Sequence, residues 1–501
     1  MKLSQLITDL KSTTGLVSFN KMSDADFEIN QVTSDTRNLA ANTLFAAIKG
    51  TSRDGHEFLA EAVQKGVSAL VVEELNKVPS AFKGSVIQVK NSREALDRLA
   101  ASFYSYPSKS LFCVGVTGTN GKTSTTYMVE ALLNEAGFPT GVMGTINHHL
   151  LAKIWESSMT TPDPVALQKR LREFMDDGAK AAAMEVSSHA LDQKRADSVD
   201  FDVAIFTNLT RDHLDYHQTM DNYLGSKQRL FLDLFEKSGK NKKAAFINID
   251  DPYGEGIKVH SSAQKFRIGQ KNADLTFKIQ KLGVMTTDFL FQTPWGQGPI
   301  QLPMSGLHNV YNAAGAIGAA LFKGLTLEQC ALGFKKFRGV PGRLQLVPNT
   351  KQLGVFVDYA HTPDALENVL RAMLEVKKEQ GSVGRIFTIF GCGGDRDRGK
   401  RPQMAAIAEK FSDRAILTSD NPRTEDPLQI LKDVEAGFSS AYRKSKVTVE
   451  IDRKKAIVET LQNAKIHDLI LIAGKGHEDY QIIGNQKNYF SDYETALEAL
   501  S

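Results

Sequence analysis

The chain has 501 residues, of which 42% are hydrophobic and 24% are charged. This composition excludes a small disulfide-stapled fold and a mainly disordered chain, and the length predicts about two to four domains. Lysine and arginine number 61 against 58 aspartate and glutamate, so the formal net charge is only +3. A balance this close argues against a dedicated nucleic-acid-binding or membrane-surface protein, although it allows a local basic cleft for a phosphorylated ligand.

The three cysteines, Cys113, Cys330 and Cys392, lie far apart in the sequence. They form no CxxC pair, so neither a zinc ribbon nor a disulfide framework is supported, and their number and spacing fit a reducing cytoplasm. No signal-like apolar stretch follows Met1, and no run of about 18 apolar residues predicts a membrane span. We therefore expect a cytoplasmic protein without a membrane anchor.

A small α/β unit is predicted over residues 1–108. Short apolar runs have the length of strands, and other stretches repeat apolar residues at helical spacing. The strands are expected at 44–48 and 69–72, and the helices at 57–65 and 92–104. A polar segment at 106–110 that contains a proline predicts the end of this domain.

The second predicted domain covers residues 109–339 and alternates strands with helices. A buried strand at 111–116 leads through a glycine- and threonine-rich loop into a helix that ends near 136. Further strands are expected at 181–186, 203–207 and 244–249. This order predicts a doubly wound, mostly parallel sheet. Short strand-like runs between 265 and 303 predict an antiparallel extension, and a helix is expected at 308–323.

The third predicted domain covers residues 340–501 and follows a glycine-proline linker at 339–342. The alternation of strands and helices restarts there, which predicts a second, Rossmann-like parallel sheet. Its strands are expected at 355–358, 385–390, 414–418 and 469–473. Polar clusters follow these strands, at the sheet edge where open α/β folds bind ligands. The sequence thus predicts an α/β protein of three domains.

The strongest motif is the segment Gly-Val-Thr-Gly-Thr-Asn-Gly-Lys-Thr at 115–123, between a buried strand and a helix. Glycines let the backbone approach phosphate groups, and the amides at a helix start supply positive potential. Lys122 can neutralise the charge of the β- and γ-phosphates, and the hydroxyl of Thr123 suits Mg²⁺. The strict Walker pattern has a glycine where this chain has Val116, so the loop is a variant. It predicts nucleotide binding but no particular reaction, and a plain glycine turn is the alternative.

Two later segments place a carboxylate or an imidazole just after a predicted strand. Glu185 lies at the end of an apolar run, beside the predicted phosphate loop, and His213 follows the strand at 203–207. Such side chains can complete a Mg²⁺ shell together with phosphate oxygens, although either can be an ordinary loop residue. Lys227 lies in a predicted helix, and physical reasoning alone makes it a surface lysine.

Together these segments resemble the Mur ligase family, and the resemblance covers essentially the whole chain. It rests on several blocks that occur in one order, which makes it far more specific than any single loop. The blocks are 117–123, 160–162, 185–189, 208–216, 308–309 with Asn312, 341–343, 358–363, 391–396, 420–423 and 474–478.

The resemblance implies an ATP-dependent ligase that forms an amide bond. In this family ATP phosphorylates a carboxylate of the acceptor, and the incoming amine attacks the acyl phosphate. Phosphorylation supplies the leaving group that a carboxylate lacks, while the protein positions the reactants and neutralises charge. The implied acceptor is UDP-N-acetylmuramoyl-L-alanyl-D-glutamate, and the implied amine is meso-2,6-diaminopimelate, in the synthesis of peptidoglycan precursors. We expect a monomer without nucleic-acid or membrane partners.

The same resemblance implies a site that contains ATP, Mg²⁺ and a carbamate formed from CO₂ on Lys227. The carbamate would turn a cationic side chain into an anionic ligand for a second Mg²⁺ ion. The expected catalytic residues are Lys122, Glu185, His213 and Lys227, and the expected metal ligands are Thr123, Glu185, His213 and the carbamate of Lys227. The expected ATP contacts are Gly118, Thr119, Asn120, Gly121, Lys122, Thr123, Ser124, His308, Asn309 and Asn312, with Arg343, Asp358 and His361 contributing on domain closure.

The resemblance also assigns the acceptor contacts. In the first domain the expected contacts of the UDP part are Ser34, Thr36, Thr51, Ser52 and Arg53. Thr36 stands where the family usually has a serine, and it keeps a hydroxyl. The positions that match contacts of the muramoyl-dipeptide part are Thr160, Thr161, Ser187, Gln193 and Arg195. Without the resemblance, Gln193 and Arg195 would be interpreted as solvated helix or loop residues.

The third domain is expected to select the amino acid. Arg423 ends the segment Asp-Asn-Pro-Arg after a strand, and its guanidinium can pair with a carboxylate. Diaminopimelate has a second carboxylate that lysine lacks, and lysine-adding members of the family usually lack this arginine. Glu478 suits an ammonium group. The expected amino-acid contacts are Arg396, Asp420, Asn421, Pro422, Arg423, Gly474 and Glu478.

The sequence leaves three alternatives open. They are an L-lysine-adding member, another ligase of the superfamily such as folylpolyglutamate synthetase, and a non-catalytic nucleotide-binding switch. The blocks at 34–37 and 420–423 favour the diaminopimelate-adding ligase. A ligase releases phosphate only when acceptor and amine are both present, whereas a switch binds or hydrolyses ATP alone.

Overall fold

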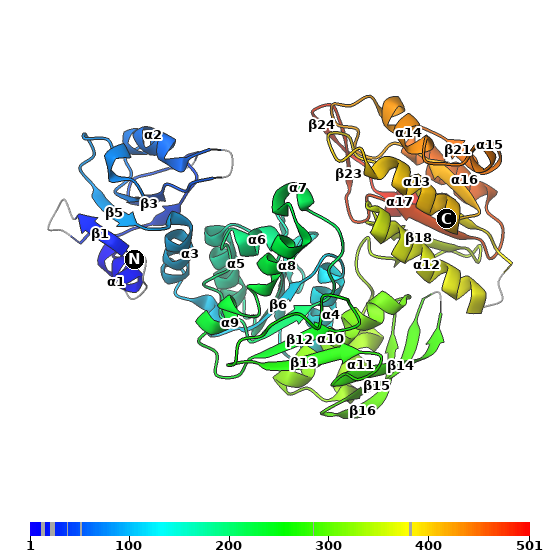
Figure 1. Ribbon diagram of the computed structural model, residues 1–501, viewed down its shortest axis with the longest axis horizontal. Helices are drawn as coiled ribbons and strands as arrows, with labels where there is room; N and C mark the ends of the chain where they lie inside the picture. The colour runs from blue at the N-terminus through cyan, green and yellow to red at the C-terminus, as the bar shows by residue number, and fades with distance from the viewer. Residues whose placement is uncertain (12–15, 21–25, 38, 51–52, 284, 380–382) are drawn as a thin grey trace. The chain divides into compact units, whose positions relative to one another are not determined.

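The structure is a computed structural model that describes residues 1–11, 16–20, 26–37, 39–50, 53–283, 285–379 and 383–501. These residues form two compact units, and each is described by itself. The first comprises Met1–Lys122 and Ala136–Arg267, and the second comprises Thr123–Glu135 and Ile268–Ser501. Both units alternate helices with strands (Figure 1), which confirms the predicted α/β class. The division into three domains at about 108 and 340 stays a prediction.

A five-stranded sheet near the start of the first unit has the order β1-β5-β4-β3-β2. Strand β1 runs antiparallel to β5, and the other neighbours are parallel. The expected strands at 44–48 and 69–72 are β3 and β4, which are fully buried. The elements are β1 (Leu16–Asn20), β2 (Gln31–Thr33), β3 (Thr43–Ala46), β4 (Ala69–Val72), β5 (Ser85–Val89), α1 (Leu3–Lys11), α2 (Leu59–Gln64), α3 (Ser92–Phe103) and the 3₁₀ helices η1 (Gly55–Phe58), η2 (Leu75–Lys77) and η3 (Pro107–Lys109).

The first unit also contains strands in the order β12-β11-β6-β10-β7-β8-β9. The strands from β12 to β7 are parallel, which confirms the predicted sheet, whereas β8 and β9 are an antiparallel addition that the sequence did not predict. Strands β6, β10 and β11 are buried along their whole length, as their continuous apolar runs indicate. The strands are β6 (Phe112–Thr117), β7 (Thr140–Met143), β8 (Asn147–Leu150), β9 (Lys153–Glu156), β10 (Ala181–Glu185), β11 (Val203–Phe206) and β12 (Ala244–Asn248). The helices are α5 (Pro164–Asp176), α6 (Ser188–Asp192), α7 (Leu214–His217), α8 (Met220–Gln228) and α9 (Asp233–Lys237).

The antiparallel extension predicted between 265 and 303 is present. Strand β14 pairs with β15, and β15 pairs with β16, both antiparallel. The phosphate loop leads into α4, and the helix expected at 308–323 is α10. The elements are α4 (Lys122–Glu135), β13 (Gln264–Gly269), β14 (Leu275–Leu282), β15 (Thr287–Thr293), β16 (Gly296–Leu302), α10 (Leu307–Lys323) and α11 (Leu327–Lys336).

A six-stranded sheet in the second unit has the order β17-β18-β22-β19-β20-β21. Apart from the short β17 it is parallel, as predicted, and an apolar core covers each face. The strands are β17 (Gln345–Leu346), β18 (Gly354–Asp358), β19 (Ile386–Phe390), β20 (Arg414–Leu417), β21 (Val447–Val449) and β22 (Leu469–Ala473), with a separate hairpin of β23 (Tyr480–Ile483) and β24 (Gln486–Tyr489). The helices are α12 (Pro363–Glu379), α13 (Lys400–Phe411), α14 (Pro427–Glu435), α15 (Ser440–Lys446), α16 (Arg453–Asn463) and α17 (Asp492–Leu500).

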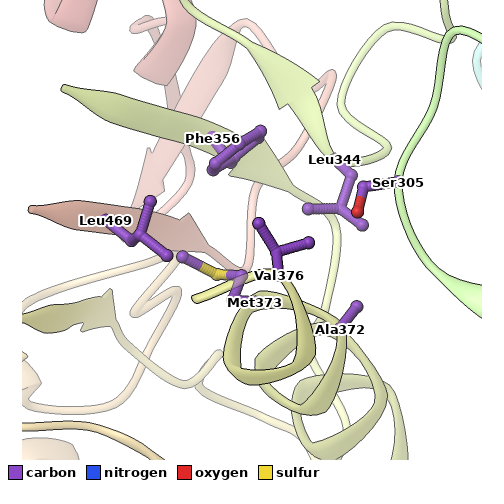
Figure 2. A pocket seen from close by; sticks show the side chains of 7 residues that line it. All are labelled: Ser305, Leu344, Phe356, Ala372, Met373, Val376 and Leu469. Atoms are coloured by element: carbon purple, nitrogen blue, oxygen red, sulfur yellow. The ribbon is translucent and has the colours of Figure 1, made fainter. Parts of the chain in front are cut away.

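A cavity of about 10 Å³ lies between α12 and the strands β18 and β22. Figure 2 shows Met373 and Val376 projecting from α12 toward the sheet. The lining residues are Ser305, Leu344, Phe356, Ala372, Met373, Val376 and Leu469. A buried water needs about two to four polar partners, and this lining offers a single hydroxyl. The cavity is therefore a packing defect rather than a ligand site.

Among the described residues, no helix combines the length and the apolar character that crossing a bilayer requires.

Candidate active site

The predicted phosphate loop connects the end of β6 to the start of α4. Gly118 has a φ of +152°, and a Cβ atom built there would lie 1.9 Å from the hydroxyl oxygen of Thr207. That hydroxyl donates to the carbonyl of Asn120 at 2.6 Å. Only glycine fits this approach, so the residue type at 118 is dictated by the neighbouring strand end.

Asn208, directly after β11, holds the loop from the side. Its Oδ1 accepts from the amide of Asn120 at 2.9 Å, and its Nδ2 donates to the carbonyl of Asn120 at 3.2 Å. The carbonyl of Asn208 also accepts from the amide of Thr119 at 2.9 Å. Asn208 was not among the predicted site residues, although its position after a strand, like that of Glu185, was a usable signal.

Two lysines converge on the loop. Lys122 donates from Nζ to the carbonyls of Gly118 at 2.9 Å and Thr119 at 2.8 Å. Lys227 donates from Nζ to the same carbonyl of Gly118 at 2.8 Å, and its Nζ lies 4.4 Å from the ring centre of Tyr223. The interpretation of Lys227 as a surface lysine is wrong, because its relative exposure is 1% and α8 directs it at the loop. Burial and the positive charge of Lys122 hold the pKa of Lys227 well below its usual value.

Glu185 lies at the end of β10, in register with Val116 on the strand that leads into the loop. It is 1% exposed, and its carboxylate accepts from Thr145, from the amide at 2.8 Å and from the hydroxyl at 3.1 Å. Thr145, which the sequence analysis missed, thus fixes the direction of this carboxylate.

His213 directly precedes α7 and has a φ of +53°, in the left-handed region that a non-glycine residue rarely adopts. Its Nε2 lies 3.3 Å from Oδ2 of Asp212, and its ring centre lies 4.8 Å from that of His189. Burial lowers the pKa of His213, which favours the neutral imidazole that can bind a metal. Within the described residues, however, no three His, Cys, Asp or Glu side chains are close enough together to hold a metal ion.

The residues expected at the muramoyl-dipeptide part form one hydrogen-bonded network beside Glu185. Thr161 donates from its hydroxyl to the carbonyl of Glu185 at 2.9 Å and accepts from the amide of Ser187 at 3.0 Å. Arg195 donates to the carbonyl of Thr161 at 3.1 Å and to Oε1 of Gln193. The hydroxyls of Thr160 and Thr145 lie 3.0 Å apart. Arg195 and Gln193 are half-buried, so the interpretation as solvated residues is wrong.

Of the residues expected at the UDP part, Ser34 and Thr36 come shortly after the end of β2. Ser34 and Arg53 are exposed, and Lys65 donates to the carbonyl of Thr36 at 2.7 Å. Two further predicted contacts, Thr51 and Ser52, lie outside the described residues.

The second unit holds the remaining predicted ATP contacts. Asn309 donates to the carbonyl of Ser305 at 2.8 Å, and Asn312 donates to Oδ1 of Asn309 at 3.2 Å. Burial lowers the pKa of His308, which precedes Asn309 on α10, to about 4. Among the loop residues, Thr123 and Ser124 are buried in the first turn of α4.

Arg343, directly after the linker at 339–342, contacts the first turn of α4. Its Nη2 donates to the hydroxyl of Thr123 at 3.2 Å, and its guanidinium carbon lies 4.9 Å from the ring centre of Tyr359. Asp358 accepts from the amides of Leu344 at 2.6 Å and Ala360 at 2.8 Å, and burial raises its pKa. The ring of His361 interacts through Nδ1 with the carbonyl of Tyr359 at 2.9 Å.

The predicted amino-acid contacts gather at the carboxyl ends of β20 and β22. Asn421 donates to Oε2 of Glu478 at 2.9 Å. Between them lies Lys475, which is fully buried and which the sequence analysis did not select. Its Nζ lies 3.2 Å from Oδ1 of Asn421, 3.4 Å from Oδ1 of Asp420 and 3.5 Å from Oε2 of Glu478. Gly474, with a φ of +115°, faces the carboxylate of Asp420.

Arg423 and Arg396 flank this cluster. Arg423 has a φ of +52° and donates from Nη1 to the carbonyl of Gly394 at 2.8 Å. Arg396 is exposed, and Pro422 is buried. Nearby in the fold, the buried Arg401 on α13 donates to Glu425 at 2.9 Å and to Asp433 on α14 at 2.8 Å. These bonds connect the segment that follows Arg423 to both helices.

Three family models match this chain. "Mur ligase family, catalytic domain" matches residues 28–104, "Mur ligase middle domain" matches 116–320, and "Mur ligase, glutamate ligase domain" matches 342–476.

Curated relatives match along almost the whole chain. A UDP-N-acetylmuramoyl-L-alanyl-D-glutamate–2,6-diaminopimelate ligase from Geobacter sulfurreducens is 44% identical over 493 residues, which cover 95% of each chain. The protein of the same name from Bacillus licheniformis is 41% identical and covers 100% of this chain and 99% of its own.

Solved structures agree with these relatives. A structure described as a UDP-N-acetylmuramoyl-L-alanyl-D-glutamate–2,6-diaminopimelate ligase is 30% identical, with a TM-score of 0.68, and covers 97% of this chain and 99% of its own. A folylpolyglutamate synthase from Mycobacterium tuberculosis in complex with ADP is 18% identical, with a TM-score of 0.61, covers 75% of this chain and 91% of its own, and shares the fold.

Proposed function

The chain belongs to the Mur ligase family, and from this premise we propose that it joins 2,6-diaminopimelate to UDP-N-acetylmuramoyl-L-alanyl-D-glutamate. It is an ATP-dependent ligase that forms an amide bond in the synthesis of peptidoglycan precursors. The observation that carries the substrate assignment is the identity of 44% to a ligase of that name over 95% of both chains. Membership of this ligase family excludes the alternative of a non-catalytic nucleotide-binding switch.

The reaction consists of two transfers. An oxygen of the acceptor carboxylate attacks the γ-phosphorus of ATP, which forms an acyl phosphate and releases ADP. The neutral amine of diaminopimelate then attacks the acyl carbon, and the nitrogen loses one proton to solvent as the amide bond forms. Inorganic phosphate leaves with the electrons of the broken carbon–oxygen bond. Because both substrates of the first step are anionic, Lys122 and the amides at the start of α4 lower the barrier by neutralising phosphate charge. We assign the remaining loop residues from Gly118 to Ser124 to the same phosphates.

Mg²⁺ would be held by Thr123, Glu185, His213 and a carbamate on Lys227. Bound there, it would neutralise the negative charge that develops during phosphoryl transfer. The protein side chains alone supply few ligands, so phosphate and carbamate oxygens would complete the shell. The burial and the lowered pKa of Lys227 support the carbamate, because only a neutral amine attacks CO₂.

The acceptor would be held by the network of Thr160, Thr161, Ser187, Gln193 and Arg195, with its UDP part at Ser34, Thr36, Thr51, Ser52 and Arg53. The contact between Thr161 and the carbonyl of Glu185 supports this assignment, since it joins the network to a proposed metal ligand. Arg195 supplies a guanidinium suited to a carboxylate or phosphate.

Diaminopimelate would be held by Arg396, Asp420, Asn421, Pro422, Arg423, Gly474 and Glu478. In this arrangement Arg423 pairs with the carboxylate that lysine lacks, and Glu478 faces an ammonium group. The contact of Asn421 with Glu478 supports a single site for both charges.

The remaining assignments concern the nucleotide, the domain boundaries and the cellular location. We assign His308, Asn309, Asn312, Arg343, Asp358 and His361 to the nucleotide, and the hydrogen bond from Arg343 to Thr123 supports that assignment. The gaps between the three family matches support domains that meet near 108 and 340. We propose a cytoplasmic location, because ATP is the co-substrate and the three cysteines are free and buried. We also propose a monomer that binds no nucleic acid and no membrane.

A ligation assay tests the function. Purified protein is incubated with ATP, Mg²⁺, the UDP-muramoyl-dipeptide and one amino acid from a panel, and phosphate release and the ligated product are both measured. We expect product and stoichiometric phosphate with meso-diaminopimelate, and no phosphate when either acceptor or amino acid is omitted. A clear preference for L-lysine, or for glutamate on a folate acceptor, contradicts the substrate assignment.

A further inference from the structure

The hairpin of β23 and β24 stands apart from the six-stranded sheet, as a two-stranded sheet of its own (Figure 1). It begins two residues after Glu478. Ile483, next to its turn, is 53% accessible to solvent, and Tyr489, which pairs with Tyr480, is 70% accessible, whereas Gln481 and Ile482 are half-buried. An isolated two-stranded hairpin is only marginally stable, so contacts with the rest of the chain must hold this one in place.

The hydroxyl of Tyr489 donates to Glu494 on α17, and several further hydrogen bonds join the hairpin to residues 420–423. Gln481 donates from Nε2 to the carbonyl of Asp420 at 2.7 Å, and the amide of Ile482 donates to Oδ1 of Asn421 at 2.9 Å. The backbone of Arg423 then pairs with the hairpin in a parallel bridge. Its amide donates to the carbonyl of Ile482 at 3.1 Å, and its carbonyl accepts from the amide of Gly484 at 2.8 Å.

These hydrogen bonds hold the backbone of Arg423, which has an unfavourable conformation. Arg423 has a φ of +52°, a conformation that residues with a side chain seldom adopt and that persists only where the surroundings fix it. The bridge to the hairpin satisfies both backbone groups of Arg423 in that conformation. The direction of the guanidinium therefore depends on the hairpin.

The same hairpin is continuous with Glu478, the proposed partner of the ammonium group. Asn421 connects the two sides, since its Oδ1 accepts from Ile482 while its Nδ2 donates to Glu478 at 2.9 Å. The hairpin thus sets the separation between a carboxylate and a guanidinium that would bind opposite charges of one amino acid.

We propose that the β23–β24 hairpin fixes the spacing between Arg423 and Glu478, and that Gln481 is a positioning residue for diaminopimelate. The proposal rests on the proposed function, because it presumes that these two side chains bind the amino acid. Gln481 does not touch the substrate; it acts by holding the carbonyl of Asp420 and, through it, the segment that ends at Arg423.

The test compares Gln481→Leu with Gln486→Leu, a matched substitution at an exposed position on the other strand of the hairpin. Steady-state kinetics are measured with each of the three substrates varied in turn. Loss of one hydrogen bond corresponds to a change of about three- to tenfold. We expect the KM for meso-diaminopimelate to rise by that factor in Gln481→Leu, with kcat and the KM values for ATP and the acceptor within twofold of the wild type. Gln486→Leu should match the wild type throughout.

A double-mutant cycle with Arg423→Ala sharpens the test. If Gln481 acts through Arg423, Gln481→Leu raises the KM for diaminopimelate little further once Arg423 is absent. Full additivity, an unchanged KM in the single variant, or a parallel change in kcat and all KM values overturns the proposal. Should Gln481→Leu be insoluble, Gln481→Glu keeps the shape, replaces the donor by an acceptor and takes its place. A wild type that ligates no diaminopimelate contradicts the proposed function instead, so the two failures are distinguishable.

Discussion

Lys122 and Lys227 share one hydrogen-bond acceptor, the carbonyl oxygen of Gly118, at 2.9 Å and 2.8 Å. Two ammonium groups on one oxygen repel each other, and the repulsion is strong where water is excluded. Burial and this repulsion both hold the pKa of Lys227 well below its usual value, which favours its neutral amine. A carbamate on Lys227 would reverse the sign of the interaction and place an anion beside Lys122.

The first prediction concerns Lys227. Lys227→Met should lower kcat by about 100-fold or more, because it removes an anionic ligand of the Mg²⁺ that would neutralise the transferred phosphate. Wild-type enzyme stripped of CO₂ should regain activity when bicarbonate is added, whereas the variant should not. With ¹³C-labelled bicarbonate, a carbamate signal should be visible by NMR in the wild type and absent from the variant.

Lys243 offers a matched control for that experiment. It too is a buried lysine with a lowered pKa, but it donates to the carbonyls of Phe235 at 2.7 Å and Ser238 at 3.0 Å instead of the glycine loop. Lys243→Met should leave the carbamate signal in place. Full activity of Lys227→Met, or failure of CO₂ to restore the stripped wild type, would rule out the carbamate.

The second prediction concerns Asn208, which holds both backbone groups of Asn120 in the phosphate loop. Asn208→Ala removes two hydrogen bonds of about 1 kcal/mol each, so the KM for ATP should rise by about tenfold or more. The KM values for the acceptor and for diaminopimelate should stay within twofold. The exposed Asn222 on α8 provides the control, and Asn222→Ala should change none of these values. An equal rise for all three substrates would show that Asn208 supports the fold rather than the loop.

Much of the framework could be predicted from the sequence because its signals are local. The apolar runs of β6 and β10 and the glycine-rich segment between β6 and α4 are readable from neighbouring residues alone. The burial of Lys227 is different in kind. It depends on how α8 packs against a loop more than a hundred positions earlier, and the helix itself carries polar residues on several sides.

The candidate site shows the same limit. Asp420 and Glu478 could be proposed from a family resemblance, but Lys475, which lies between them, has no local feature that distinguishes it from a solvated lysine. The contact of Gln481 with the carbonyl of Asp420 joins residues 61 positions apart, and no periodicity in the sequence encodes it. Hydrogen bonds between distant loops are set by tertiary packing, which single-sequence patterns do not record.

The third prediction is a pH dependence centred on Asp97. This carboxyl group on α3 is fully buried, accepts from the hydroxyl of Ser198, and lies near Asp197. Burial, reinforced by the charge of Asp197, raises its pKa to about 8. The folded chain therefore keeps a proton that the unfolded chain releases near pH 4. The contribution of Asp97 to the free energy of unfolding is therefore fully present below about pH 4 and is lost as the pH rises toward 8.

Asp97→Asn replaces the protonated carboxyl by a neutral group of the same shape. The free energy of unfolding of the variant, relative to the wild type, should therefore increase by about 1 kcal/mol per pH unit between pH 5 and pH 8. Urea unfolding at several pH values measures the difference. A constant difference across that range would show that Asp97 does not hold its proton in the folded protein.

The fourth prediction concerns a buried ion pair that joins α16 to α17. Arg453 donates from Nε and Nη2 to the two carboxylate oxygens of Asp492, both at 2.7 Å, and the two side chains are completely inaccessible to solvent. Nη2 of Arg453 also donates to the carbonyl of Ala473 at 2.9 Å, at the end of the strand that precedes Gly474. Asp492→Ala leaves a buried charge without its partner and should cost about 3–5 kcal/mol of stability.

The two helices supply their own control. Lys454 and Glu498 form an exposed pair between the same helices, with a distance of 3.8 Å and side chains 64% and 72% accessible. Lys454→Ala should therefore cost less than about 1 kcal/mol. The double variant Arg453→Met with Asp492→Leu removes both charges and keeps apolar volume, so its loss should be well below the sum of the single losses. Urea unfolding followed by circular dichroism measures these variants together with the single variants Arg453→Met and Asp492→Leu. Additive losses would show that the two side chains contribute through separate contacts rather than as a pair.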